Sequence, residues 1–369
     1  MRIVQIYLCI DLEIIFNVKI ILLNKIISED VSHIIKQFDS WDNFKGKTVL
    51  ITGANGFLPA YLVETFLALA PSFNTKVIAL VRNKAKAKKR FSHLIDNPLL
   101  KLLIQDVSVE FDIKDKIDFI IHAASQASPK YYGVDPVGTL SANVLGTINL
   151  MKLATKNNVE SFLYFSSGEV YGEVREDQIP IKEDTFGHLD CTNVRACYGE
   201  SKRMGENICV SYLAQYGVKA KIVRPAHTYG PGMALDDGRV FADFVSNIIN
   251  KQDIVLKSDG SAVRPFCYLA DATLGYLRVL VDGEDGQAYN IGNPFEEYSM
   301  LELANELVKL YPEFGLKVVV DNAVSSNNYL KSPIKRISLA IDKVAALGWV
   351  PAVTVPEGFK RTILSFLND

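Results

Sequence analysis

The sequence predicts an α/β fold: a doubly wound parallel sheet with a second, smaller α/β part. Two observations carry this prediction. From Lys47 onward, short apolar runs rich in β-branched residues alternate with helical stretches, and these runs are apolar on both faces. Strands of that kind lie in parallel sheets that helices cover on both sides. From about Arg224 the pattern changes to loops rich in glycine and proline, followed by helices and isolated strands.

The elements of the large sheet follow in chain order. The first strand is expected in TVLITG, and the helix AYLVETFLALA comes after it. A second strand, KVIALVR, precedes a charged helix, and two further strands are expected in FIIHAAS and SFLYFSS. The part after Arg224 includes the helix SMLELANELVKLY. We expect it to close over the carboxyl edge of the sheet, where doubly wound folds bind their ligands.

The first 28 residues are apolar enough to raise the question of a signal peptide or a membrane span. Asp11, Glu13 and Lys19 interrupt every apolar run, whereas a span needs roughly 18 or more mostly uncharged residues. A small-residue cleavage site is also missing. We therefore interpret this stretch as an extension that neither spans a membrane nor directs export.

A short amphipathic helix is expected from Ser28, which would act as its N-cap. Acidic residues follow the serine directly. The apolar residues recur at helical spacing and would pack on the domain that follows; they are Val31, Ile34, Ile35 and Phe38.

Composition excludes several classes of partner. The chain has 369 residues with 40 Lys and Arg against 42 Asp and Glu, so its formal charge of −2 offers no basic face to nucleic acid or to an anionic membrane. A small ligand is the expected partner. Five cysteines without CxxC spacing indicate reduced thiols in a reducing compartment, for which we expect the cytoplasm, and they predict no metal site.

The segment TGANGF, residues 52–57, is typical of a turn that holds phosphates. Gly53 permits a tight turn after the strand, and Gly56 lets the backbone approach a pyrophosphate. The helix that begins near Phe57 would offer its first N–H groups to the phosphates. Pro59 stands where a third glycine is expected, but proline is tolerated in a first helical turn. We expect Pro59 to shift the helix slightly and to leave the dinucleotide site intact.

A second motif lies downstream, where Tyr198 and Lys202 are four residues apart on one face of a helix. A tyrosine phenol has a pKa near 10, so it acts as a base at neutral pH only where cations stabilise its phenolate. Lys202 and a positively charged nicotinamide would supply that charge. A chance pair of surface residues is the alternative, and the glycine turn and the strand-end Ser166-Ser167 argue against it.

Taken together, these segments resemble a family, the extended short-chain dehydrogenase/reductases acting on nucleotide sugars (the NAD-dependent epimerase/dehydratase family). The resemblance runs from about Lys47 to Phe366. It is carried by TGANGF, HAAS, NVLGTINL, SSGEVYG, YGESK, VRPAHTYGPG, VRPFCYLAD and YNIGNP. Within the family the chain most resembles the UDP-glucuronate decarboxylases (UDP-xylose synthases), through GPGMALDDGRVFADFV, the Arg264 segment and the tail from Ile341.

The resemblance implies a Rossmann-type dinucleotide-binding domain at 41–225, after an extension with a short helix at 1–40. A substrate domain at 226–369 would be interleaved with it. The residues that the resemblance places at the cofactor are Gly53, Asn55, Gly56, Phe57, Arg82, Asp106, Val107, Ala123, Ala124, Tyr198 and Lys202. Asn143 matches a cofactor-side asparagine of the family, and it reads equally well as a helix-start residue.

In this family the reaction begins with oxidation at C4 of the sugar. The resemblance implies that Tyr198 takes the hydroxyl proton, Ser167 hydrogen-bonds the same oxygen, and the hydride passes to NAD. Because the hydride later returns, we expect NAD, although the basic run that begins at Arg82 lacks the acid of many NAD sites and would favour NADP.

The residues after Ser167 bear on what happens to the 4-keto sugar. The family's hexose dehydratases carry an Asp-Glu pair there, and simple 4-epimerases usually lack the glutamate. Here the pair is Gly168-Glu169, and the decarboxylases carry a glutamate at the position of Glu169. Decarboxylases commonly have serine before it, so Gly168 departs from their pattern too. We expect decarboxylation of a uronic acid, with Glu169 among the catalytic residues. The alternative is 4,6-dehydration or 4-epimerisation.

Three residues are implied on the substrate side. Arg264 matches an arginine that faces the sugar or diphosphate, and its fork suits phosphate or carboxylate. Arg239 matches the decarboxylases' arginine near the nucleotide. His227 replaces an asparagine that the family uses against the substrate. The resemblance also implies a homodimer, paired through the helices near 137–157 and 198–215, and a role in polysaccharide synthesis. A dinucleotide-binding protein without catalysis is the remaining alternative, which intact Ser167, Tyr198 and Lys202 disfavour.

Overall fold

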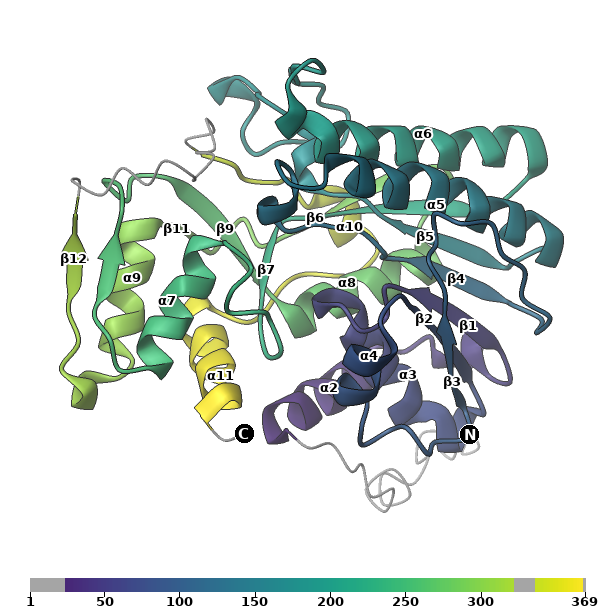
Figure 1. Ribbon diagram of the computed structural model, residues 1–369, viewed down its shortest axis with the longest axis horizontal. Coiled ribbons are helices and arrows are strands. Elements are labelled where there is room, and N and C mark those ends of the chain that lie inside the picture. The colour runs from purple at the N-terminus through teal and green to yellow at the C-terminus, as the bar shows by residue number, and fades with distance from the viewer. Residues whose placement is uncertain (1–23, 322–335, 368–369) are drawn as a thin grey trace, which may run out of the picture.

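A seven-stranded parallel sheet lies at the centre of the computed structural model, which describes residues 24–321 and 336–367 (Figure 1). The strand order is β10-β6-β5-β4-β1-β2-β3, and every pairing is parallel. The strands are β1 (Thr48–Thr52), β2 (Lys76–Val81), β3 (Leu100–Ile104), β4 (Phe119–His122), β5 (Ser161–Phe165), β6 (Ala220–Pro225) and β10 (Ala288–Ile291). The winding reverses between β1 and β4, so the predicted doubly wound sheet is confirmed.

Helices cover both faces of this sheet (Figure 1). One face carries α5 (Pro136–Asn157) and α6 (Cys197–Tyr216), and the other carries α3 (Phe57–Phe73) and α8 (Leu269–Asp282). Successive residues of β1 divide between two cores: Leu50 packs with the α5 and α6 side, whereas Val49 and Ile51 pack with the α3 and α8 side. Burial on both faces explains why the strands are apolar throughout.

The smaller α/β part lies beside the large sheet, at the left of Figure 1. Its three-stranded sheet has the order β11-β9-β7, and a second sheet pairs β12 with β8. The strands are β7 (His227–Tyr229), β8 (Ile254–Leu256), β9 (Val263–Tyr268), β11 (Glu297–Ser299) and β12 (Val318–Val320). The helices of this part are α7 (Val240–Ile249), α9 (Met300–Lys309) and α11 (Val355–Leu367), while α4 (Lys84–Arg90) and α10 (Asp342–Ala345) are short helices elsewhere. Between β9 and β11 the chain returns to the large sheet through α8 and β10.

Helix α2 (Lys25–Gln37) precedes the large sheet and packs on α3 and α8. Asn24 caps it, with the side-chain oxygen accepting hydrogen bonds from the N–H groups of Ile26 and Ile27. The expectation that Ser28 caps the helix is therefore wrong by one turn, because Asn24 supplies the acceptor earlier and leaves Ser28 inside the helix. The apolar face of α2 is buried through Val31 and Ile34.

The interpretation of the N-terminal extension concerns residues that lie outside the described ranges, up to residue 23. Among the described helices, none combines the length and apolar character required to cross a membrane.

Helix α6 approaches the sheet closely at Gly205. A Cβ atom added there would lie 2.0 Å from the hydroxyl oxygen of Tyr164 on β5 and 2.3 Å from its Cζ atom. Tyr164 is fully buried, so its ring has no room to move aside. The absence of a side chain at Gly205 therefore sets the height of α6 above the sheet.

We predict that Gly205→Ala lowers the free energy of unfolding by about 1 to 3 kcal/mol, because overpacking outweighs the better helix propensity of alanine. Urea unfolding of the two proteins measures the difference. Gly133→Ala is the control, since no neighbouring atom lies within 4 Å of the added Cβ. Equal unfolding midpoints for Gly205→Ala and the unaltered protein would contradict the close approach.

Candidate active site

The glycine turn lies where the winding of the sheet reverses. Gly53 follows β1 with φ of +62°, a conformation that glycine adopts without strain. A Cβ atom there would lie 2.8 Å from Cα of Ala124 and 3.2 Å from the carbonyl oxygen of Ala123, both just after β4. The turn and the end of β4 therefore touch at the position where doubly wound folds bind dinucleotides.

Helix α3 begins directly after this turn, with Gly56 as its N-cap and Phe57 as its first residue. Asn55 lies within the turn. Pro59 is the third residue of the helix, which continues without a break to Phe73, and the Pro59 ring lies beside Gly56. Proline costs no intrahelical hydrogen bond at this place. The substitution of proline for the third glycine thus leaves the first turn of α3 in place.

Arg82 and Asp106, both predicted at the cofactor, approach each other across the ends of β2 and β3, with 3.8 Å between Nη1 and Oδ2. Burial raises the pKa of the Asp106 carboxyl, but hydrogen bonds from Ser108 and the charge of Arg82 outweigh burial and lower that pKa. Val107 is buried, and its carbonyl accepts a hydrogen bond from Asn149 of α5. These residues lie along the β1 to β3 half of the sheet edge.

A buried chain of polar groups joins the glycine turn to helix α6. The hydroxyl of Thr52 lies 2.9 Å from Nδ1 of His122, whose Nε2 lies 3.1 Å from the hydroxyl of Thr147. Thr147 donates to the carbonyl of Asn143, and the Asn143 amide donates to Ser201 at 2.9 Å. Each of these five side chains is at most 1% exposed.

The hydrogen positions in this chain follow by elimination. Thr147 uses its proton on the Asn143 carbonyl, so it must accept from Nε2 of His122, which leaves Nδ1 to accept from Thr52. Thr52 then accepts from the N–H of Ala124. Burial and the charge of Lys202 lower the pKa of His122 to about 3, so the neutral ring that this pattern needs is the stable form.

Asn143 lies inside α5, which starts at Pro136 and is capped by Asp135. Its interpretation as a helix-start residue is therefore wrong. Its amide nitrogen binds Ser201, whose hydroxyl donates to the carbonyl of Tyr198, while its Oδ1 atom is buried and has no partner among the described residues. Asn143 thus supports the helix that carries the tyrosine.

Tyr198 and Lys202 lie in the first two turns of α6. The Lys202 ammonium donates to the carbonyl of Phe165 at 2.6 Å and lies 5.7 Å from the centre of the Tyr198 ring. Ser167 follows β5 and hydrogen-bonds the Tyr198 hydroxyl. The structure therefore brings Ser167, Tyr198 and Lys202 together, at the carboxyl end of β5.

Burial sets the proton affinities of both groups. It raises the pKa of Tyr198 to about 12, with the Glu169 charge adding to the rise and Ser167 and Arg239 opposing it. Burial lowers the pKa of Lys202 to about 7, against the charge of Glu206. The phenol accordingly keeps its proton at neutral pH, and it becomes a base only when additional positive charge arrives beside it.

The predicted substrate residues cluster next to this group. His227 begins β7 and pairs in register with Phe266 of β9, two residues beyond Arg264. Burial lowers the pKa of His227 to about 3, and the charges of Arg264 and Arg239 contribute to that lowering. The charge of Arg239 also lowers the pKa of Tyr198, so Arg239 acts on both His227 and the tyrosine.

Gly168 and Glu169 begin the short helix after Ser167. Glu169 is exposed, and its carboxylate is near enough to raise the pKa of Tyr198. A Cβ atom on Gly168 would meet its nearest neighbour, the carbonyl oxygen of Pro225, at 3.6 Å, an ordinary contact. The space around Gly168 would therefore accept a Cβ atom.

Sequence reasoning missed Tyr132, whose buried ring stacks on that of Tyr198 with 5.2 Å between centroids and 14° between planes. Its hydroxyl donates to the carbonyl of Ala127. It also missed Glu206, which accepts from Ser166 and forms a two-bond ion pair with Arg224. A carboxylate one turn beyond Lys202 was the available signal for Glu206, whereas the pairing of Tyr132 with Tyr198 depends on the fold alone.

A family model described as the NAD dependent epimerase/dehydratase family matches residues 49–292. UDP-glucuronic acid decarboxylase 1 of Arabidopsis thaliana is 35% identical over 320 residues, 87% of this chain and 70% of the relative. UDP-glucuronic acid decarboxylase 1 of Xenopus tropicalis is 31% identical over 324 residues, 88% of this chain and 73% of the relative.

Solved structures match the fold at lower identity. The UDP-glucuronic acid 4-epimerase of Bacillus cereus, in complex with UDP-glucuronic acid and NAD, is 21% identical with a TM-score of 0.72, covering 86% of this chain and 98% of its own. The dTDP-glucose 4,6-dehydratase of Bacillus anthracis, in complex with NAD, is 19% identical with a TM-score of 0.70, covering 87% and 96%. At these identities the likeness concerns the fold.

We predict that Lys202→Met changes how stability depends on pH. The pKa of Lys202 is about 7 in the folded protein and about 10.4 in an unfolded chain, so between these values the unfolded protein binds more protons. Stability of the unaltered protein should rise with pH across this window, relative to Lys202→Met, by up to about 1.4 kcal/mol per pH unit. Urea unfolding at pH 7, 8 and 9 measures it; parallel profiles for the two proteins would refute the buried-ammonium argument.

Proposed function

The chain belongs to the NAD dependent epimerase/dehydratase family, and we propose that it is a decarboxylase of a nucleotide-linked uronic acid. The family's dependence on NAD confirms the prediction of that cofactor. Relatives named UDP-glucuronic acid decarboxylase, from a plant and a vertebrate, support UDP-glucuronate as the first substrate to test. The observation that carries the proposal is the grouping of Ser167, Glu169, Tyr198 and Lys202 beside two arginines.

The residues at the reversal of the sheet fit a dinucleotide. The positive φ of Gly53 and the bare N-cap at Gly56 leave backbone N–H groups open to a pyrophosphate. Asp106 and Arg82 would face the adenosine end, and Lys202 the nicotinamide ribose. When bound, NAD would accept a hydride from C4 of the sugar and return one later in the cycle.

Tyr198 is proposed as the base that removes the proton from the C4 hydroxyl, with Ser167 hydrogen-bonded to the same oxygen. Its high pKa means that it holds this proton firmly once taken and can return it to the product oxygen. The positive charges of Lys202 and Arg239 would both lower the cost of forming the phenolate. Arg264 and His227 would hold the diphosphate or sugar.

Loss of CO2 demands little further chemistry from the protein. A carboxylate on the carbon next to a C4 ketone leaves readily, and the proton that replaces it can come from a group close to the sugar. Glu169 is exposed, and we propose that its carboxylate relays this proton from water to the carbon that has lost CO2. Ordinary 4,6-dehydration would call for a second acid at position 168, which is glycine. Epimerisation at C4 remains the second candidate, because the Bacillus cereus epimerase shares this fold.

We further propose that residues 41–225 bind the cofactor and residues 226–369 the nucleotide sugar, in the cytoplasm. A homodimer is proposed through α5 and α6, which pack side by side on one face (Figure 1). Apolar side chains are exposed along both helices: Val137, Leu140 and Leu145 on α5, and Met204, Val210 and Tyr216 on α6. Such an apolar face is typical of a subunit contact.

Incubation of the purified protein with UDP-glucuronate and NAD tests the proposed reaction. We expect release of CO2 and a UDP-pentose or its 4-keto form, detected by mass spectrometry. Tyr198→Phe should lose activity by about a hundredfold or more. Tyr212→Phe, the same change farther along α6, is the matched control and should keep activity. A product of unchanged mass with inverted C4 would establish an epimerase instead, and loss of water from a nucleotide hexose a dehydratase.

The proposed dimer gives a separate prediction. Leu145→Glu places a charge on the exposed apolar face of α5, where Leu145 is 49% exposed, and should convert the dimer to a monomer in light scattering coupled to gel filtration. Val320→Glu, at a comparably exposed valine in β12, should leave the mass unchanged. A monomeric unaltered protein would contradict the proposal directly.

A further inference from the structure

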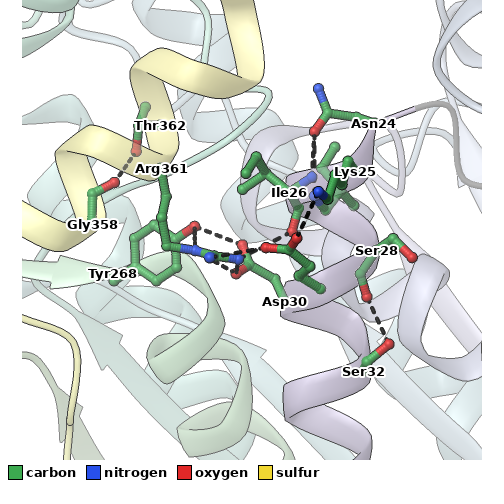
Figure 2. A network of polar contacts seen from close by, with 12 residues as sticks. Asn24, Lys25, Ile26, Ser28, Asp30, Ser32, Tyr268, Gly358, Arg361 and Thr362 are labelled. Carbon is green, nitrogen blue, oxygen red and sulfur yellow. Dashed lines mark hydrogen bonds and ion pairs between the residues drawn. The ribbon is translucent and has the colours of Figure 1, made fainter. Parts of the chain in front are cut away.

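A buried carboxylate on α2 binds side chains from three other elements. Figure 2 shows two of these side chains, Tyr268 and Arg361. Asp30 is 3% exposed. Its Oδ2 atom accepts from the hydroxyls of Tyr61, at 2.9 Å, and Tyr268, at 2.7 Å. Its Oδ1 atom accepts from Nη2 of Arg361 at 2.7 Å and from Nε at 3.2 Å.

These partners come from both parts of the molecule. Tyr61 lies one turn into α3, the helix that starts at the glycine turn. Tyr268 ends β9, the strand that carries Arg264, and Arg361 belongs to α11, which packs against β9. Asp30 is therefore a single anchor for the cofactor side and the substrate side.

A second contact joins the N-terminus of α2 to α11. The Asn24 side chain donates to the carbonyl of Ser365 at 2.7 Å, and Arg361 also bonds Glu29 and the carbonyl of Ile26. Helix α2 thus packs against both α3 and α11 and is joined to each by hydrogen bonds. Figure 2 shows the contact of α2 with Arg361 of α11.

The buried carboxylate is needed by its partners. Two tyrosine hydroxyls and one guanidinium donate to it. Among the described residues, removing the charge of Asp30 would leave Arg361 paired with the exposed Glu29 alone. Losing one member of a buried ionic network is costly, because the remaining groups are desolvated without compensation. Asp30 therefore joins the three elements through one ionic network, in addition to the apolar core that they share.

We propose that Asp30 is a positioning residue: through Tyr268 and Arg361 it fixes β9 and α11 relative to α3, and so sets the place of Arg264 opposite the cofactor turn. This inference rests on the proposed binding of a nucleotide sugar beside β9. It assigns to α2 a part in substrate binding, although α2 lies before the family match at residues 49–292.

The test compares Asp30→Asn with the unaltered full chain, using UDP and NAD as probes in calorimetric titrations. The glycine turn stays attached to the large sheet, so NAD affinity should change by less than about twofold. UDP affinity should fall by about fivefold or more, a size typical of coupling between sites. Tyr268→Phe removes the hydroxyl that links β9 to Asp30 and to Arg361. It should shift UDP affinity in the same direction and serves if Asp30→Asn does not fold.

Lys221→Met is the matched control. Lys221 is a buried lysine on β6 that pairs with the partly exposed Asp285 at 2.9 Å, so its loss also breaks the ion pair of a buried charged side chain. It should lower stability and leave the ratio of UDP to NAD affinity unchanged. Equal losses of UDP and NAD affinity in Asp30→Asn, no loss of either, or the same selective loss in Lys221→Met would overturn the proposal.

Hydrogen exchange separates this inference from the proposed function. In Asp30→Asn the backbone amides of β9 and α11 should exchange faster than in the unaltered protein, while those of α5 should not. If the unaltered protein binds NAD but no UDP, the proposed function fails. The hydrogen-exchange comparison alone then tests whether Asp30 holds β9 and α11 in place. Uniform acceleration over all elements would then reduce Asp30 to a general contributor to stability.

Discussion

Polar side chains can act in this sheet only where its strands end, because helices bury both faces along its length. Strands β1 and β4 are neighbours in the sheet, and the winding runs in opposite directions on either side of them. Gly53, after β1, contacts Ala124, after β4, at this reversal. Any side chain on Gly53 would push the two strand ends apart. The turn, the tyrosine on α6 and the arginines of the smaller part all take their positions from this one edge.

The edge is also where the interior becomes polar: hydrogen bonds join its buried side chains from Thr52 to Ser201, and Oδ1 of Asn143 is left without a partner among the described residues. His122 is neutral within this series of hydrogen-bonded side chains, so the series places no charge beneath the glycine turn. The buried charged group next to this series is Lys202, whose ammonium donates a hydrogen bond to the carbonyl of Phe165. Burial works against ionising either Tyr198 or Lys202, so the pair is matched to a ligand that brings its own positive charge.

Local patterns in the sequence predicted those features that depend on neighbouring residues. Apolar strands, the glycine turn and the pair Tyr198 and Lys202 each occupy a few consecutive positions, and the fold keeps them as expected. The helix-start positions predicted at Asn143 and Ser28 were wrong, because helix α5 starts seven residues before Asn143 and α2 starts three residues before Ser28. Contacts between distant segments could not be foreseen: Tyr132 on Tyr198, and Asp30 among Tyr61, Tyr268 and Arg361, have no signature in spacing or composition.

The contact between α2 and α11 bears on how the connectivity of the polypeptide could be changed. Because the Asn24 side chain reaches the carbonyl of Ser365, the beginning and the end of the described fold lie side by side, although 341 positions separate them in the sequence. A short flexible linker from Leu367 to Asn24 would close the backbone into a ring. New chain ends could then open at an exposed loop, giving a circularly permuted protein in which cofactor turn and substrate strands keep their present neighbours.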